Sequence, residues 1–320
     1  MKEVKWGVIG LGNIAHEFAE GMNGLNQRIY AVASRKKESL LEFKEKYAVQ
    51  KTYSTYEELL DDPDVEAVYI ALVNSEHYKW IIACIEHGKN VLCEKAIWGN
   101  YNDMEKAYAL ATEKGLILAE AMTIYHMPIF QKIKEMIREG VLGNIKFVEA
   151  ELGSLKEDDP TNRFFNPELG GGAMLDIGTY GLSFVTMFLP GKITDATSLS
   201  VPYRTGADEM WGINLRTDTG QIGSVNLTFR AKLPKRGIIA GDKAYIVVMN
   251  YVRAEKATLV YPDGKEEIIE VGETAKAFQY EILDIEKALE TKNPATAYID
   301  NTKTVVQLMH QFLSEHNYSV

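Results

Sequence analysis

The stretch 7–22, GVIGLGNIAHEFAEGM, decides how the first third of the chain folds. It contains the pattern G-x-G-x-x-A at Gly10, Gly12 and Ala15, between an apolar run and an amphipathic segment. In a strand-turn-helix unit the first glycine makes a tight turn, the second lets the backbone approach a pyrophosphate, and the small third residue permits close helix packing. The stretch therefore predicts a dinucleotide site at a helix N-terminus, with a purely structural glycine turn as the alternative.

Beyond this motif, the first 120 residues alternate short apolar runs with longer amphipathic segments, which is typical of a parallel sheet covered by helices. We expect strands at 5–10, 29–34, 67–72, 90–94 and 116–121, with a brief one near Thr52. Helix N-caps are expected at the starts of 55–58 (TYEE) and 102–105 (NDME), and helix ends at Gly88 and Gly115. This pattern predicts an α/β domain over residues 1–122, a doubly wound parallel sheet of the Rossmann type.

The pattern changes after Pro128. A helix is expected to Arg138, followed by strands at 147–152, 212–217, 222–229, 244–250 and 257–262 and by helices at 273–290 and 298–316. Residues 123–320 are therefore expected to form an α+β domain with a mostly antiparallel open sheet that binds substrate. Because one face of such a sheet lacks helices and must be covered or polar, we expect a homodimer or homotetramer through it.

Composition excludes several classes of protein. The chain has 320 residues, 46% of them hydrophobic, and a net charge of -10 with scattered cations, which argues against nucleic acid or an anionic membrane as partner. No apolar run approaches the roughly 18 residues of a membrane span, and glycines interrupt the N-terminal apolar stretch, so a cytoplasmic protein is expected. Cys84 and Cys93 have no metal-ligand spacing, so we expect buried thiols and no metal site.

The end of the second expected strand indicates which dinucleotide binds. The sequence AVASRKKE at 31–38 has no acid before Glu38, whereas an NAD site places one near this strand end to hold the ribose 2'-hydroxyl. Ser34, Arg35 and Lys36 offer a hydroxyl and two cations to a 2'-phosphate instead. We therefore expect NADP rather than NAD; the alternative is that the cations only solvate a helix start.

A second motif, FNPELGGGAMLDIGTYGLSF at 165–184, has three glycines followed by an apolar helix carrying Asp176 and Tyr180. At positions i and i+4 these two side chains would share one helix face. The pattern alone leaves a structural hydrogen-bonded pair and a catalytic pair equally open.

Four stretches together resemble the Gfo/Idh/MocA family of oxidoreductases over nearly the whole length: GLGNIA (10–15), VNSEH (73–77), CEK (93–95) and NPELGGGAMLDIGTY (166–180). The resemblance implies that Lys95 lies near the reactive carbon and the nicotinamide, and that Asp176 and Tyr180 complete the site. Tyrosine at 180 is similar to the family branch of the dimeric dihydrodiol dehydrogenases, in which it is the general acid or base.

The chemistry of these residue types agrees with the resemblance. Hydride transfer at a carbinol carbon needs a group that takes or supplies the hydroxyl proton. A free tyrosine titrates near ~10, and a lysine ammonium within about 4–6 Å favours the phenolate. We therefore expect Tyr180 as general acid or base, Lys95 as the group that lowers its pKa, and Asp176 as the residue that orients them.

The resemblance also implies roles for other residues. Cofactor contacts are expected from Asn13 and Ile14 in the first helix turn, and from Val73, Asn74 and His77 after the expected strand at 67–72. Glu94, beside Lys95, and Arg163, in the second domain, are expected to contribute as well. His77 has the alternative of a helix-start histidine satisfied by backbone, and Arg163 that of a partner for Asp158 or Asp159. Substrate contacts are expected from Thr123, Tyr125, His126 and Phe164.

Two positions depart from the family pattern. Many members have proline after the lysine, with a cis peptide bond, whereas this chain has Ala96, so the bond is left open as cis or trans. Thr123, Tyr125 and His126 stand where dihydrodiol dehydrogenases tend to have Trp, Arg and Phe, so an aromatic diol is not the expected substrate.

The leading hypothesis is an NADP-dependent dehydrogenase or reductase acting on a sugar, polyol or related carbonyl compound. Two alternatives remain at this point: a glycoside hydrolase of the same fold that uses its nicotinamide transiently, and a non-catalytic sensor of sugar or dinucleotide. Retention of both Lys95 and Tyr180 argues against a sensor, which has no need of proton transfer.

Overall fold

The computed structural model describes residues 3–97 and 100–318. Contacts divide the chain into two units. The first comprises residues up to Met122 together with Ala275–Asp300, and the second comprises Thr123–Thr274 together with the residues from Asn301 onward. The sequence-based division after residue 122 assigns 275–300 to the second domain, whereas the contacts of this segment are with the first unit. The first unit is therefore built from two separate stretches of chain.

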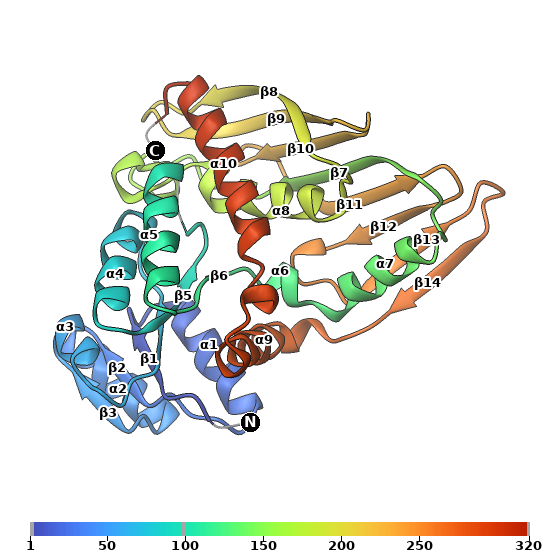
Figure 1. The fold of residues 1–320 in the computed structure, drawn as a ribbon. Coiled ribbons are helices and arrows are strands. Elements are labelled where there is room, and N and C mark those ends of the chain that lie inside the picture. Colours follow the sequence, from blue (N-terminus) through green and yellow to red (C-terminus); the bar gives the residue numbers. More distant parts are fainter. Residues whose placement is uncertain (1–2, 98–99, 319–320) are drawn as a thin grey trace. The chain divides into compact units, whose positions relative to one another are not determined.

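Six parallel strands form the sheet of the first unit (Figure 1). Their spatial order is β3 (Lys51–Tyr53), β2 (Ala31–Ala33), β1 (Trp6–Ile9), β4 (Ala67–Ile70), β5 (Asn90–Glu94) and β6 (Leu118–Ala121). The order reverses between β1 and β4, and ligands of open α/β sheets bind outside the carboxyl ends of the strands at such a point. All six strands lie within predicted runs, so the predicted Rossmann sheet is confirmed.

The helices of the first unit are α1 (Asn13–Gly24), α2 (Lys37–Tyr47), α3 (Tyr56–Leu60), α4 (Asn74–Glu86), α5 (Tyr101–Glu113) and α9 (Ala277–Thr291). Thr55 and Glu58 form the predicted capping box of α3. The predicted cap at Asn102 is wrong, because Asn100 accepts hydrogen bonds from the N–H groups of Asn102 and Asp103 and α5 begins at Tyr101. The predicted helix-ending glycines have positive φ, 72° at Gly88 and 66° at Gly115.

Helix α9 completes the core of the first unit. Its Phe278 and Ile282 join the buried cluster that contains Phe18 of α1. Gly21 of α1 lies so close to α9 that a Cβ there would be 2.7 Å from the Cβ of Phe278. At the other end, Trp6 Nε1 of β1 donates to Glu286 of α9 at 3.1 Å. Residues 3–122 alone would leave this face of α1 uncovered.

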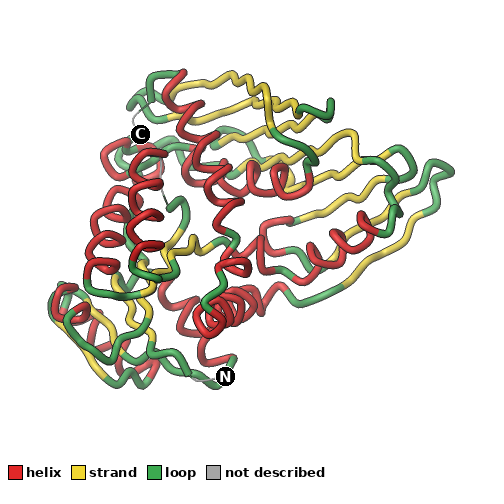
Figure 2. The backbone as a smooth tube through the Cα atoms, viewed as in Figure 1, coloured by secondary structure: helices red, strands yellow, loops and turns green. Residues whose placement is uncertain are grey.

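Eight strands form the sheet of the second unit, drawn in yellow in Figure 2. Their order is β14 (Glu266–Glu270), β13 (Lys256–Val260), β12 (Tyr245–Met249), β11 (Leu233–Gly241), β7 (Ile145–Gly153), β10 (Ile222–Thr228), β9 (Asp208–Thr217) and β8 (Ile193–Pro202). Only the pairing of β7 with β10 is parallel among these described strands, which confirms the mostly antiparallel sheet.

Three strands of this sheet were not predicted. In β8 the alternation is carried by Ser and Thr rather than by large apolar residues, and β11 contains Pro234. In β14 three of the five residues are glutamate. Each of them pairs with a strand that the sequence did predict: β8 with β9, β11 with β7, and β14 with β13. Pairing with that neighbour, rather than the local sequence, therefore makes these segments strands.

The helices of the second unit are α6 (Thr123–His126), α7 (Pro128–Arg138) and α8 (Thr179–Phe188), with most of α10 (Ile299–Glu315). Helix α8 packs on one sheet face, where Gly223 and Gly237 make room for Val185 and Phe184. A π-helical turn, Met174–Gly178, leads directly into α8. The sheet thus supports the segment that carries Asp176 and Tyr180.

Candidate functional site

The glycine-rich loop has the geometry of a pyrophosphate cradle. Gly10 has φ of +85°, and a Cβ there would overlap the carbonyl oxygen of Ala71 after β4. Gly12 caps α1 in ordinary extended backbone, and a Cβ there would meet no described atom within 4 Å. The backbone at Gly12 therefore faces open space at the N-terminus of α1, where N–H groups attract phosphate. Asn13, Ile14 and the fully buried Ala15 form the first turn of α1, so the loop fits a dinucleotide.

The end of β2 carries the three residues expected at a 2'-phosphate. Ser34 is largely buried, and its Oγ accepts a hydrogen bond from the N–H of Lys36 at 3.1 Å. Arg35 and Lys36 are exposed, and the Arg35 guanidinium lies 5.9 Å from the centre of the Tyr56 ring. A cavity of about 720 Å³ has Ser34, Arg35 and Lys37 in its wall.

At the ends of β4 and β5, His77 links two loops. Val73 caps α4, whose first turn contains Asn74 and His77. The His77 ring is fully buried; Nδ1 lies 3.0 Å from the carbonyl oxygen of Ala96 and Nε2 3.2 Å from that of Leu72. Burial lowers the pKa of His77. A neutral ring donates its one N–H to one of these two oxygens, so backbone can satisfy this histidine; its cofactor contact stays a prediction.

Glu94 ends β5, and Lys95 directly follows it at the carboxyl edge of the sheet. The Lys95–Ala96 peptide bond is cis, which answers the question left by the sequence. Glu94 is largely buried and accepts hydrogen bonds from the hydroxyl of Tyr69 and from the N–H of Lys95, the latter at 3.3 Å. Glu94 is thus held within the sheet edge, beside a half-buried Lys95.

In the second unit, Asp176 and Tyr180 lie on either side of the junction between an unusual turn and α8. The sequence predicted one α-helix for both, and this is wrong: Asp176 lies in the π-helical turn, and Tyr180 is the second residue of α8. A π-helical turn is wider than an α-helical one and is frequent at functional sites. Lys156 Nζ lies 3.7 Å from Asp176 Oδ2, and both side chains are mostly buried.

Asp208, at the start of β9, anchors this turn. Its Oδ2 accepts hydrogen bonds from the N–H of Met174 and from Nε1 of Trp211, both at 2.6 Å. Gly172, with φ of +121°, has no room for a Cβ because the Asp208 carboxylate occupies that space. Burial raises the pKa of Asp208 despite these donors. Gly172 of the motif thus makes room for a buried carboxylate of this chain.

Phe164 and Arg163 lie beside Lys156. The Lys156 ammonium is 3.6 Å from the centre of the Phe164 ring, and the Arg163 guanidinium is 4.3 Å from it. Asp158, one alternative partner of Arg163, instead pairs with Arg204 at 2.8 Å. The other alternative partner, Asp159, accepts from the hydroxyl of Thr161 at 2.7 Å. Phe164, Lys156 and Asp176 therefore form one cluster in the second unit.

The three residues of α6 expected to contact substrate are buried. Thr123, Tyr125 and His126 have exposed fractions of 4%, 1% and 4%. The hydroxyl of Tyr125 shares a hydrogen bond with Ser183 Oγ of α8 at 2.7 Å. Tyr125 therefore supports the helix that carries Tyr180, and a substrate role for these three residues stays a prediction.

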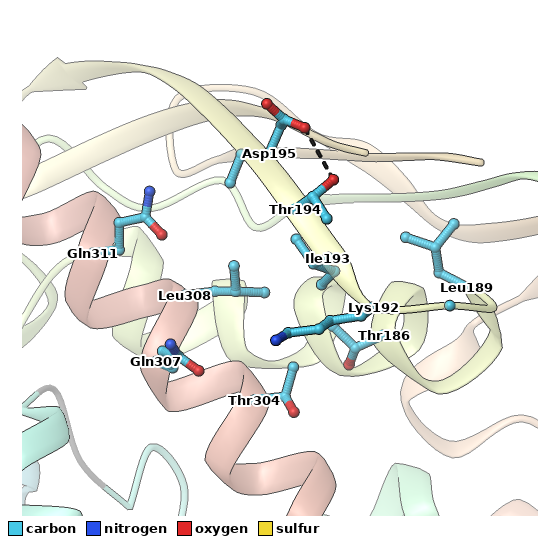
Figure 3. Close-up of a pocket in the computed structure, with 12 residues that line it drawn as sticks. Thr186, Leu189, Lys192, Ile193, Thr194, Asp195, Thr304, Gln307, Leu308 and Gln311 are labelled. Carbon is cyan, nitrogen blue, oxygen red and sulfur yellow. Dashed lines mark hydrogen bonds between the residues drawn. The ribbon is translucent and has the colours of Figure 1, made fainter. Parts of the chain in front are cut away.

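A separate cavity of about 400 Å³ lies between α10 and β8 (Figure 3). Its wall includes Lys192, Asp195 and Gln311, and Thr194 donates to Asp195 at 3.0 Å. None of the site residues predicted from the sequence lines this cavity.

Comparisons with known proteins identify the family. Residues 4–122 match the model of an oxidoreductase family with an NAD-binding Rossmann fold, and residues 130–247 match the GFO/IDH/MocA C-terminal domain. The trans-1,2-dihydrobenzene-1,2-diol dehydrogenase of Xenopus laevis is 31% identical over 280 residues, covering 86% of this chain and 84% of the relative. That of Mus musculus is 30% identical over 247 residues, covering 75% and 73%. This chain belongs to the GFO/IDH/MocA oxidoreductase family.

Solved structures extend the GFO/IDH/MocA fold over nearly the whole chain. A 3-ketoreductase from Actinomadura kijaniata, in complex with NADP and TDP-benzene, matches with a TM-score of 0.86 and 22% identity over 96% of each chain. Levoglucosan dehydrogenase in complex with NADH and levoglucosan matches with a TM-score of 0.87 and 20% identity, covering 99% of this chain and 98% of that one. One neighbour was solved with NADP and the other with NADH, so the likeness does not choose between them.

Several residues of this GFO/IDH/MocA chain were missed by sequence reasoning. Lys156 and Tyr69 contact the predicted site residues Asp176 and Glu94, and Asp208 contacts the turn that carries Asp176, yet each comes from a segment without a motif. Glu120 in the apolar stretch LILAEA was a usable signal, because a largely buried carboxylate needs donors; it accepts from the N–H of Ile97 at 2.9 Å.

Three further features concern the described residues, 3–97 and 100–318. Cys84 and Cys93 are buried free thiols, as predicted. In this range no cluster of three His, Cys, Asp or Glu residues has the geometry to hold a metal ion. No helix in it combines the length and apolarity that a membrane crossing requires.

Proposed function

We propose that this chain transfers a hydride between nicotinamide and a carbinol or carbonyl carbon of a sugar, polyol or related small molecule. The observation that carries the proposal is the position of Lys95. It directly follows β5 at the carboxyl edge of the sheet that carries the glycine-rich loop. Membership of an oxidoreductase family and the sugar ligand named for one solved neighbour support the same reaction class.

The dinucleotide, when bound, supplies or accepts the hydride at its nicotinamide ring. Gly10, Gly12, Asn13, Ile14 and Ala15 would hold its pyrophosphate at the N-terminus of α1. Val73, Asn74, Glu94 and Lys95 would line the edge of the same sheet, with His77 holding the two loops together and Arg163 contributing from the second unit. The assignments in the first unit rest on the positions of the residues at the strand ends, whereas that of Arg163 rests on the family resemblance.

Tyr180 is the proposed general acid or base. A phenol titrates near ~10, and a lysine ammonium within about 4–6 Å lowers that pKa by roughly one to three units. In the proposal Lys95 supplies this ammonium, and Asp176 orients the reacting groups. Lys156 Nζ lies 3.7 Å from Asp176 Oδ2, and a carboxylate engaged in such an ion pair is suited to an orienting rather than a proton-transferring role.

Substitution of Tyr180 tests the assignment. Tyr180→Phe should lower turnover about 10²- to 10⁴-fold in a spectrophotometric assay of NADPH oxidation or NADP reduction with a screen of sugars and 2-ketoaldehydes. Tyr261→Phe is the matched control, because Tyr261 has a lysine nearby, Lys265 at 5.4 Å from its ring centre, but lies in the β13–β14 turn and has no role in the proposed mechanism. Equal turnover of the two variants would remove Tyr180 from the mechanism.

We also propose that NADP is preferred over NAD. Ser34, Arg35 and Lys36 at the end of β2 present a hydroxyl and two cations, and Arg35 adds a planar guanidinium suited to phosphate. Arg35→Ala should weaken NADPH binding at least about tenfold while changing NADH binding much less. Dissociation constants measured by fluorescence titration decide the matter, and equal or tighter NADH binding by the unmodified protein would refute the preference.

A homo-oligomer through the second sheet is the third part of the proposal. The strand register places the exposed Leu199, Ile222, Met249 and Ile268 on the sheet face opposite α8. Leu199 is 78% and Ile268 66% exposed, on the two edge strands β8 and β14, and large apolar side chains exposed on one sheet face support an interface there. Sedimentation should show a dimer or tetramer, and Leu199→Glu with Ile268→Lys should dissociate it. A monomer at micromolar concentration would exclude this interface.

A further inference from the structure

Tyr251 is a buried phenol without an evident structural use for its hydroxyl. The residue is fully buried in the turn between β12 and β13. Among the atoms of residues 3–97 and 100–318, its hydroxyl oxygen has no hydrogen-bond partner. A buried hydroxyl without a partner destabilises the fold relative to phenylalanine of the same shape. The presence of tyrosine at this position therefore calls for a functional reason.

The hydroxyl of Tyr251 lies beside the helix that carries Tyr180. It is 3.7 Å from the position that a Cβ of Gly181 would occupy, and Gly181 is the residue after Tyr180. One turn further along α8, the ring of Phe184 is 5.1 Å from the Tyr251 ring. Tyr251 thus packs against the first two turns of α8.

Two acidic groups, Tyr180 and Glu151, act electrostatically on Tyr251 when they are ionised. Burial, followed by the charges of Tyr180 and Glu151, raises the pKa of Tyr251, so that it keeps its proton. Glu151 is already compensated by the Arg236 guanidinium, whose Nε lies 2.9 Å from it. A hydroxyl without a hydrogen-bond partner is free to rotate, so its O–H dipole can turn toward an ionised Tyr180.

We propose that Tyr251 is a positioning residue that stabilises the Tyr180 phenolate through the dipole of its own un-ionised hydroxyl. This inference rests on the proposed role of Tyr180 as general acid or base. Tyr251 contacts neither substrate nor cofactor in it, and acts only by lowering the pKa of Tyr180 from the buried side of α8.

Other titratable and charged groups face the same turn and must be considered in any pH profile. The elements packed against it are α6, α8, β7 and β11. The titratable and charged groups on these elements are Tyr125, His126, Lys146, Glu149, Glu151, Tyr180, Lys235 and Arg236, and the turn itself carries Arg253. Among these groups, only Tyr180 is proposed to transfer a proton in the reaction. A change in the pH dependence of turnover after mutation of Tyr251 therefore reports on the pKa of Tyr180.

The test is Tyr251→Phe, followed by thermal unfolding and by the pH dependence of turnover in alcohol oxidation. We expect an unchanged or higher melting temperature. The rising limb of the profile should move to higher pH, with turnover near pH 7 reduced about threefold to tenfold. Tyr203→Phe is the control: it deletes a hydroxyl that donates to Asp158 at 2.6 Å, so it should lower the melting temperature and leave the profile in place.

Each other outcome overturns the inference. An unmoved profile in Tyr251→Phe, while Tyr180→Phe is inactive, removes Tyr251 but keeps Tyr180. A lowered melting temperature in Tyr251→Phe means that the hydroxyl is bonded in the folded protein, which contradicts the premise. Full activity of Tyr180→Phe refutes the proposed function itself and is recorded in the same assay.

Discussion

The two glycines of the first loop should respond in opposite ways to the same substitution. Gly12 has φ of -84° and ψ of -176°, which any residue adopts, and its Cβ would face space without described atoms. Gly12→Ala should therefore leave stability within about 0.5 kcal/mol or raise it slightly, since alanine has less conformational freedom in the unfolded chain. Gly10→Ala places a Cβ at positive φ against Ala71, which costs about 2 kcal/mol or more.

Binding should separate the two variants as well. The alanine methyl at position 12 fills the space through which a pyrophosphate would approach the backbone, so NADPH affinity should fall at least about tenfold in a protein of normal stability. Gly10→Ala should lower the melting temperature by several degrees, because about 1 kcal/mol corresponds to roughly 2–4 °C for a chain of this size.

Thermal unfolding and fluorescence titration on both variants give the four measurements required. The reasoning fails if Gly12→Ala binds NADPH normally, because the open space beside Gly12 would then have another purpose. It also fails if Gly10→Ala melts like the unmodified protein.

Two further predictions concern stability. Burial raises the pKa of Asp62, but hydrogen bonds from Tyr53, from the N–H of Asp64 and from Lys51 outweigh it and hold that pKa at about 2. A lowered pKa stabilises the fold above the unfolded value, 3.8, and this contribution is lost as the pH falls toward 2. Asp62→Asn should thus lower the free energy of unfolding in urea by about 2 kcal/mol at pH 7, and the variant and the unmodified protein should become more alike below pH 4. A stability difference that does not change with pH would contradict a lowered pKa of Asp62. Asp208→Ala leaves the N–H of Met174 and the Trp211 indole without their acceptor and should cost about 2–5 kcal/mol, whereas Asp208→Asn keeps an oxygen there and should cost less. Equal losses in these two variants would show that the charge matters rather than the acceptor.

Much of the first unit follows from local sequence. Its six strands and the cap at Thr55 could be predicted because apolar runs, glycines and capping residues act within a few positions of one another. The contact of α9 with α1 could not, because Gly21 and Phe278 are brought together only by the tertiary fold. Asp208 and Lys156 could not be predicted for the same reason. Their partners lie in the motif at 165–184, but their own segments carry no sequence pattern.

The candidate site was predicted as residue types rather than as geometry. Motifs indicated Lys95, Asp176 and Tyr180, yet they did not predict the π-helical turn, whose first N–H, that of Met174, donates to the distant Asp208 carboxylate. For His77 the sequence left two alternatives open, a cofactor contact and backbone carbonyl oxygens. A histidine at a helix start has the same sequence signature in both cases.

The contribution of α9 to the first unit has a consequence for biosynthesis. The ribosome has synthesised all six strands by residue 121, yet the apolar side of α1 is covered only after Phe278 and Ile282 have been synthesised. At about 5–20 residues per second this interval lasts on the order of ten seconds, during which the nascent sheet exposes an uncovered apolar surface. The nascent chain should therefore be a substrate for chaperones at this stage, and a fragment that ends at residue 122 should aggregate.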